Sequence, residues 1–190
     1  MSMILASASP RRKEILEMLG VKDMRIIPAK GEERVPENAS PAQIVRALAL
    51  QKGREVAAAA GEGEIVIAAD TIVWHENRIY GKPHSEAEAV AMLSALSGKT
   101  HTVYTGVAVI KDGVELSEAE ETKVHFRPIS DGEIRAYVKS GEPMDKAGAY
   151  GAQGRASVFV QGIEGDFFNV MGLPVCLLDS MLKKIGLSLI

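Results

Sequence analysis

Hydroxyl groups and cations are concentrated in seven residues near the start of the sequence, from Ser7 to Lys13. The apolar residues 3–6 before them predict a short buried strand, and Ser9-Pro10 predicts an N-cap followed by the first helical residue. The N–H groups and the dipole of a helix N-terminus bind anions, and arginine binds phosphate oxygens through two hydrogen bonds. A capped helix with a solvated basic turn is the alternative, yet cations at that end oppose the dipole unless an anion is present. The segment therefore predicts a phosphate site.

Asp70 and Thr71 follow a nearly all-apolar segment, residues 64–69. Such a run is typical of a strand covered on both faces, here ending at Asp70-Thr71, and ligands of open α/β sheets gather at the carboxyl ends of strands. An acid at that place can hold a divalent cation or deprotonate a water molecule. It can equally cap the next turn, so the residues alone leave both interpretations open.

Two loops offer weaker candidates. Residues 81–83 (Gly-Lys-Pro) place Lys82 in a stiff loop, where it could contact phosphate. Residues 145–154 contain three glycines, which let a backbone approach a ligand closely, and Gln153, whose amide could pair with a base edge. Taken alone, the second segment is explained slightly better as a plain surface loop. Lys52 and Glu33 are not marked by any pattern of their own.

Other chemistries are excluded by spacing. Residues 98–100 (Gly-Lys-Thr) mimic the end of a P-loop, but Leu93 occupies the position that requires glycine. The four histidines lack metal-ligand spacing, and no Gly-x-Ser-x-Gly elbow is present. The single cysteine, Cys176, rules out a disulfide within the chain, and we expect it in the core because it lies in the apolar run 173–178.

The elements that must position these residues form an α/β pattern of a mixed sheet with helices on its faces. Strands are predicted at residues 3–6, 24–28, 64–69 and 157–163, with a segment pairing back over 72–80 and a long hairpin over 100–127 around Lys111-Asp112-Gly113. Helices are predicted from Pro10 to Gly20, from Pro41 to about Ala60, from Ser85 to about Leu96, from Ser130 to Gly141 and from Pro174 to Lys184, the third and fourth with Ser-x-x-Glu capping boxes.

Size and composition set the outer limits. The 190 residues are 46% hydrophobic and 25% charged, which suits one domain, or one domain split into two lobes by a cleft. A net charge of −3 argues against a general nucleic-acid binder. No apolar run approaches the roughly 20 residues that span a bilayer, and the N-terminus lacks the basic region of a signal peptide. We therefore expect a cytoplasmic protein without a membrane or nucleic-acid partner.

Taken together, the segments resemble the Maf family, which is named for septum-formation inhibition and understood as nucleoside triphosphate pyrophosphatases. The resemblance covers nearly the whole chain in order. The matching segments are Ser7 to Arg12, Ala69-Asp70-Thr71-Ile72-Val73, Gly81-Lys82-Pro83, Ser97-Gly98-Lys99-Thr100-His101, Thr105-Gly106-Val107, Gly141-Glu142-Pro143, Asp145 to Gly154 and Asn169 to Pro174.

The resemblance implies a fold and a set of roles. The family fold is an elongated single α/β domain, here residues 1–190, with a central mixed sheet flanked by helices, a deep cleft between two lobes, and often a homodimeric assembly. Asp70 takes the position of the general base. The positions that set substrate choice are Arg12, Thr71 and Gln153. The residues that match the family's cleft are Ser7, Arg11, Glu33, Lys52 and Lys82.

The resemblance also implies an activity. The family cuts a nucleoside triphosphate between its α- and β-phosphates with Mg²⁺ or Mn²⁺, for which Asp70 and Glu33 would be the ligands. Residues 146–154 are typical of the branch that acts on dTTP and UTP, although Ala152 stands where isoleucine is usual. Within the enzyme class, the alternatives are a pyrophosphatase that acts on 7-methyl-GTP or on a modified pyrimidine triphosphate. From another class, the alternative is a non-catalytic nucleotide-binding regulator of cell division.

Overall fold

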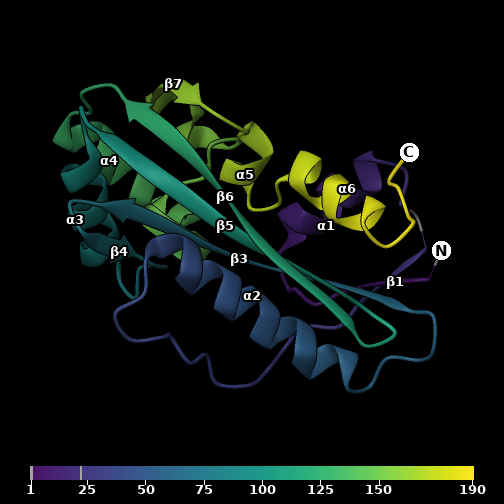
Figure 1. Ribbon diagram of the computed structural model, residues 1–190. Coiled ribbons are helices and arrows are strands. Elements are labelled where there is room, and N and C mark those ends of the chain that lie inside the picture. The colour runs from purple at the N-terminus through teal and green to yellow at the C-terminus, as the bar shows by residue number, and fades with distance from the viewer. Residues whose placement is uncertain (1, 22) are drawn as a thin grey trace. The chain divides into compact units, whose positions relative to one another are not determined.

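A mixed sheet of seven strands runs through the computed structural model, which describes residues 2–21 and 23–190 (Figure 1). The strand order is β2-β1-β3-β5-β6-β7, and β4 pairs with β3. β1 is parallel to β2 and β3, whereas β4 is antiparallel to β3 and β7 to β6. The strands are β1 (Met3–Leu5), β2 (Met24–Ile26), β3 (Ile65–His75), β4 (Arg78–Tyr80), β5 (Thr100–Lys111), β6 (Val114–Phe126) and β7 (Val160–Glu164).

The predicted α/β class and mixed sheet are confirmed. The predicted hairpin is confirmed as well: β5 and β6 are joined by Asp112 and Gly113, both with positive φ, as the tight turns of hairpins require. The chain divides into two compact units, of which the first comprises Met1–Asp70, Thr105–Glu120 and Gly172–Ile190, and the second Thr71–Tyr104 and Glu121–Met171. The single domain over residues 1–190 and its deep cleft stay predictions.

In the first unit, α2 (Pro41–Ala57) packs on one face of the sheet, and Figure 1 shows α1 (Pro10–Met18) and α6 (Val175–Lys183) on the opposite face. Ser40 and Gln43 form a capping box that starts α2. The face that α2 covers consists of alternate strand residues, because side chains of a strand point to the two faces in turn. The residues of this core that come from the strands are Ile4, Val66, Ala68, Ala108 and Ile110, and Ala6 directly after β1 belongs to it as well.

Close approach of α2 to the sheet depends on glycine. A Cβ built on Gly106 of β5 would lie 2.1 Å from the carbonyl oxygen of Val45 and 2.3 Å from its carbonyl carbon. A Cβ built on Gly53 of α2 would lie 3.1 Å from Cδ1 of the Ile110 side chain. At Gly106, the helix backbone and the strand backbone therefore meet without a side chain between them.

The second unit packs α3 (Glu86–Leu96) and α4 (Asp131–Val138) on an aromatic core, and it also contains α5 (Phe167–Met171). Phe126, Tyr137, Tyr150 and Phe159 meet edge to face, with ring centroids 4.8 to 6.3 Å apart. Three short 3₁₀ segments, η1 (Glu142–Asp145), η2 (Ala147–Ala149) and η3 (Arg155–Phe159), follow α4. Ala149 and Tyr150 of the glycine-rich segment are buried members of this core.

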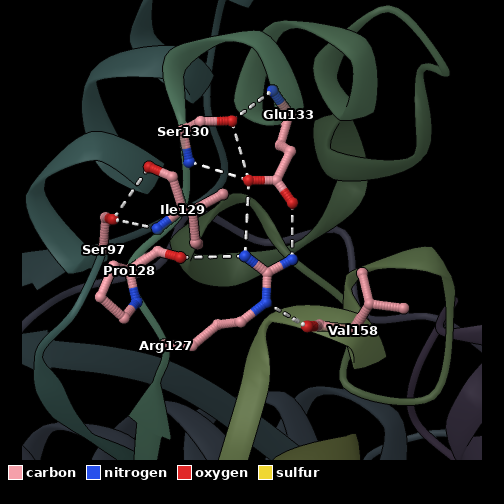
Figure 2. A network of polar contacts seen from close by, with 7 residues as sticks. All are labelled: Ser97, Arg127, Pro128, Ile129, Ser130, Glu133 and Val158. Carbon is pink, nitrogen blue, oxygen red and sulfur yellow. Dashed lines mark hydrogen bonds and ion pairs between the residues drawn. The ribbon is translucent and has the colours of Figure 1, made fainter.

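The N-terminus of α4 is fixed by an arginine at the end of β6 (Figure 2). Arg127 donates to the carbonyl of Val158 in η3 at 2.8 Å and to Glu133 at 2.7 Å. Glu133 also accepts from Ser130 and completes the predicted capping box. The Arg127 hydrogen bond and then the Ser130 bonds lower the pKa of Glu133 to about 2, so this carboxylate stays charged across the ordinary pH range.

Several local expectations were wrong. Strand 157–163 begins later, as β7, because residues 155–159 turn into η3. Glu88 accepts from the N–H of His84 rather than Ser85, so α3 has only the Ser85 half of its capping box. Cys176 is exposed on α6 rather than buried.

None of the helices in the described part of the chain is long and apolar enough to cross a membrane.

Candidate functional site

The turn between β1 and α1 is organised by Ser7. Its hydroxyl accepts from the N–H of Ser9 at 3.2 Å and from Nη1 of Arg12 at 3.0 Å. Ser9 occupies the N-cap position, as predicted, but its side chain makes no capping hydrogen bond, and the first turn contains no acidic residue. The sequence placed the helix start correctly and the capping side chain wrongly, because Ser7 turns its own hydroxyl to the loop backbone.

Arg12 is held in place rather than extended into solvent. Its Nε donates to the carbonyl oxygen of Gly172 at 2.7 Å, in addition to the bond from Nη1 to Ser7. Burial lowers the pKa of Arg12 to about 10, while the negative charge of Asp70 acts in the opposite direction. The guanidinium therefore remains charged at neutral pH, and its fixed orientation suits recognition of phosphate.

Asp70 lies within β3 and not at its end, which corrects the predicted strand boundary. β1 pairs with β3 only as far as Ile67, whose carbonyl oxygen accepts from the N–H of Ala6. β4 pairs with β3 from Val73 onward. β3 therefore continues to His75, beyond the point where the apolar run stops. Asp70 still lies past the carboxyl end of β1, so the positional argument holds for β1 rather than β3.

Lys52 joins the two predicted acidic residues. Its Nζ lies 2.5 Å from Oδ1 of Asp70 and 2.8 Å from Oε1 of Glu33. Alternate residues of a strand point to the same face, so Asp70 faces α2 as Val66 and Ala68 do. On α2, Lys52 follows the buried Ala49 by one helical turn. Asp70 is 8% exposed and the Glu33 side chain 51% exposed. The fold thus brings together two carboxylates and one ammonium that no sequence pattern linked.

Asp70 and Glu33 supply only part of what a divalent cation needs. Among the described residues, no group of three or more His, Cys, Asp or Glu side chains could hold a metal ion. Asp70 and Glu33 nevertheless converge on one cation, the ammonium of Lys52. Magnesium is commonly bound by one or two carboxylates together with substrate phosphates and water. The two carboxylates therefore suit a divalent ion that binds together with a polyphosphate rather than an ion held by protein ligands alone.

The remaining predicted site residues, Thr71, Lys82 and Gln153, belong to the second unit. The N–H of Gly148 donates to the carbonyl oxygen of Gly81 at 3.0 Å, so the Lys82 loop and the glycine-rich segment adjoin each other. Lys82 and Gln153 are exposed, and their side chains make no hydrogen bond or ion pair with other described residues, whereas Thr71 is partly buried. Both long side chains are accessible to a ligand.

Glu142 was not among the predicted site residues. Its carboxylate accepts from the N–H of Arg155 at 3.0 Å and from the hydroxyl of Tyr137 at 3.1 Å. The sequence offered only the Gly141-Glu142-Pro143 segment, with no pattern that points to a hydrogen-bonded carboxylate. Gly172, whose carbonyl binds Arg12, was missed for the same reason, since both contacts depend on tertiary structure.

Comparison with known proteins identifies the family. A family model described as Maf-like protein matches residues 2–185. The chain belongs to the Maf family. Its relatives include a dTTP/UTP pyrophosphatase of Bacillus cereus (strain AH820), 51% identical over 97% of this chain and 96% of the relative. A dTTP/UTP pyrophosphatase of Bacillus anthracis is 51% identical with the same coverage.

Among solved structures, the Staphylococcus aureus Ham1 protein is similar in fold. The similarity covers 97% of this chain and 100% of the Ham1 chain, with a TM-score of 0.51 and 14% sequence identity. At that identity the likeness concerns the fold alone. It agrees with the predicted α/β architecture of a central mixed sheet flanked by helices.

Proposed function

We propose that this Maf protein is a nucleoside triphosphate pyrophosphatase that hydrolyses dTTP and UTP to the monophosphate and pyrophosphate. The observation that carries the proposal is the convergence of Asp70, Lys52 and Glu33 in the same unit as the Arg12 turn. Curated relatives with 51% identity over nearly the full length are named dTTP/UTP pyrophosphatases, which supports the substrate assignment.

In the proposed mechanism, the β1–α1 turn binds phosphate oxygens. Arg11 and Arg12 supply positive charge there, and Ser7 holds the Arg12 guanidinium in position. A polyphosphate carries several negative charges, and fixed cations stabilise the charge that develops on the leaving pyrophosphate. Lys82 is a further proposed phosphate contact, because its ammonium is exposed and makes no ion pair within the described residues.

Asp70 is the proposed general base. Its carboxylate would accept the proton of the water molecule that attacks the α-phosphorus, a task that needs an acceptor fixed in one orientation. Lys52 provides that fixation through its contact with Oδ1. Glu33 binds the same ammonium from the solvent side.

Mg²⁺ or Mn²⁺ is the proposed cofactor, with Asp70 and Glu33 as its protein ligands; when bound it would neutralise phosphate charge and polarise the phosphoryl group.

We propose further that the protein acts in the cytoplasm on free nucleotides, without nucleic acid or membrane, and as a homodimer. Sedimentation at several protein concentrations measures the last of these.

Product analysis tests the proposed reaction. Incubation of the purified protein and Mg²⁺ or Mn²⁺ with UTP or dTTP should yield the monophosphate and pyrophosphate in equal amounts. Release of orthophosphate and a diphosphate would show that the protein cuts between the β- and γ-phosphates, not between the α- and β-phosphates as proposed. Activity on 7-methyl-GTP alone would indicate the other branch of the family, and full activity in EDTA would remove the metal from the proposal.

Gln153 is the proposed reader of the base. An amide can donate to a pyrimidine carbonyl and accept from the ring N–H, a pairing that uracil and thymine offer and cytosine does not. Gln153→Ala should lower the specificity constant for UTP and shrink the ratio of the UTP and CTP constants, because each mispaired polar group costs about 1–3 kcal/mol. The matched control is Gln161→Ala, an exposed glutamine on β7, which should leave the ratio unchanged. An unchanged ratio in Gln153→Ala would mean that the base is recognised elsewhere.

A further inference from the structure

We propose that Glu142 is a positioning residue for Gln153 and so sets which base the protein accepts; this inference rests on the proposed role of Gln153. Glu142 begins η1, directly after Gly141, whose positive φ of 75° ends the preceding helical segment. The Glu142 carboxylate contacts the N–H of Arg155 and the hydroxyl of Tyr137 rather than the Gln153 side chain. This carboxylate holds the backbone segment that carries Gln153 through hydrogen bonds.

The backbone around Gln153 is fastened on both sides. Residues 151–154 form a turn closed by a hydrogen bond of 3.0 Å from the N–H of Gly154 to the carbonyl of Gly151. Two residues after Gln153, the N–H of Arg155 donates to Oε1 of Glu142 at 3.0 Å. Two residues before it, the N–H of Gly151 donates to the hydroxyl of Tyr137 at 3.3 Å. That hydroxyl in turn donates to Glu142 at 3.1 Å, so one carboxylate anchors both sides of the turn.

The absence of a side chain at Gly154 leaves room for the Glu142 carboxylate. A Cβ on Gly154 would lie 2.1 Å from Oε1 of Glu142 and 2.8 Å from its Cδ. Gly154 has extended backbone angles, φ −99° and ψ −150°, so its conformation does not demand glycine. The absence of a side chain at residue 154 therefore serves the approach of Glu142 and not a left-handed turn.

The anchor is itself held firmly. Lys146 donates to the backbone carbonyl of Glu142 at 2.6 Å, and the Tyr137 ring packs edge to face on Phe159 at 5.4 Å. Burial, followed by the charge of Glu142, raises the pKa of Tyr137, which keeps its hydroxyl protonated and able to donate. The Gln153 side chain, in contrast, has no hydrogen-bond partner among the described residues. The backbone anchors therefore fix the position from which this side chain extends.

Two variants that disturb the anchor by different means test the proposal. Glu142→Ala removes the acceptor, and Gly154→Ala keeps it but forces the carboxylate away. We expect each to lower the ratio of the UTP and CTP specificity constants about tenfold, the scale of losing one oriented polar contact. Glu142→Gln retains one acceptor oxygen and should keep the ratio within about threefold of the wild type. Loss of activity on both nucleotides in equal proportion would indicate a structural role only and overturn the proposal.

Non-additivity separates this inference from the proposed function. In a Gln153→Ala background, Glu142→Ala should not change the ratio further, because the amide that it positions is gone. If Gln153→Ala lowers the ratio and Glu142→Ala leaves it intact, the positioning role is wrong while the proposed function stands. If no nucleotide yields pyrophosphate, both are wrong. Should Glu142→Ala fail to fold by circular dichroism, Gly154→Ala carries the same comparison.

Discussion

Asp70→Asn should reduce turnover at least about a hundredfold, the usual scale for loss of a general base. An amide has nearly the shape of the carboxylate but cannot accept the proton of the attacking water. Lys52 would keep its contact with Glu33, so the substitution does not leave the ammonium without a partner. The fold and nucleotide binding should therefore survive, and the loss should appear in kcat rather than in the melting temperature.

The matched control for this change is Asp131→Asn, the same chemical substitution at an exposed aspartate in the first turn of α4. Its turnover should equal that of the wild type. Steady-state kinetics with pyrophosphate detection measures both variants, and titration with a non-hydrolysable UTP analogue measures binding. An Asp70→Asn protein that turns over within a few-fold of the wild type would exclude Asp70 as the base.

Gly106→Ala should be the most destabilising single-methyl change in the first unit. The added Cβ would lie 2.1 Å from the Val45 carbonyl oxygen and 2.7 Å from the Arg46 nitrogen, and both neighbours are backbone atoms that no rotamer change can move. Overpacking costs about 1–3 kcal/mol and occasionally more. At about 3 kcal/mol, a chain of this length should melt about 6–12 °C lower.

Gly132→Ala provides the control for this prediction. A Cβ on Gly132 meets no atom within 4 Å, and the residue lies in the first turn of α4. Alanine there should leave the melting temperature unchanged or raise it slightly, since glycine is a weak helix former. Equal melting temperatures for Gly106→Ala and the wild type would contradict the close packing of α2 on β5.

The elements that could be predicted from sequence are those whose signals are local. Ser40-Pro41 marked the start of α2, Ser130 with Glu133 marked α4, and Asp112-Gly113 marked the hairpin turn. Each signal depends on hydrogen bonds or φ angles within a few residues. The same holds for the turn between β1 and α1, whose helix start and cationic residues are adjacent in sequence.

Features that depend on distant partners could not be predicted in the same way. The predicted pairing back over residues 72–80 is present in β3 and β4, but the apolar run did not reveal that β3 itself continues through Asp70 to His75. The turn between these strands uses Glu76 and Asn77, both with positive φ, where no glycine marks it. Lys52 and Glu33 meet Asp70 only after α2 has packed on the sheet. The family resemblance, not the residue pattern, placed Lys52 and Glu33 among the site residues.

The exposed position of Cys176 has a practical consequence. As the single cysteine of the chain, it offers one thiol on the surface of α6 to a maleimide reagent, so a fluorophore or spin label can be attached at a known place without mutagenesis. The same thiol can join two molecules by air oxidation, which would imitate an assembly in a sizing experiment. Measurements of subunit number therefore need a reductant, or a Cys176→Ser chain, before a covalent artefact can be separated from a native dimer.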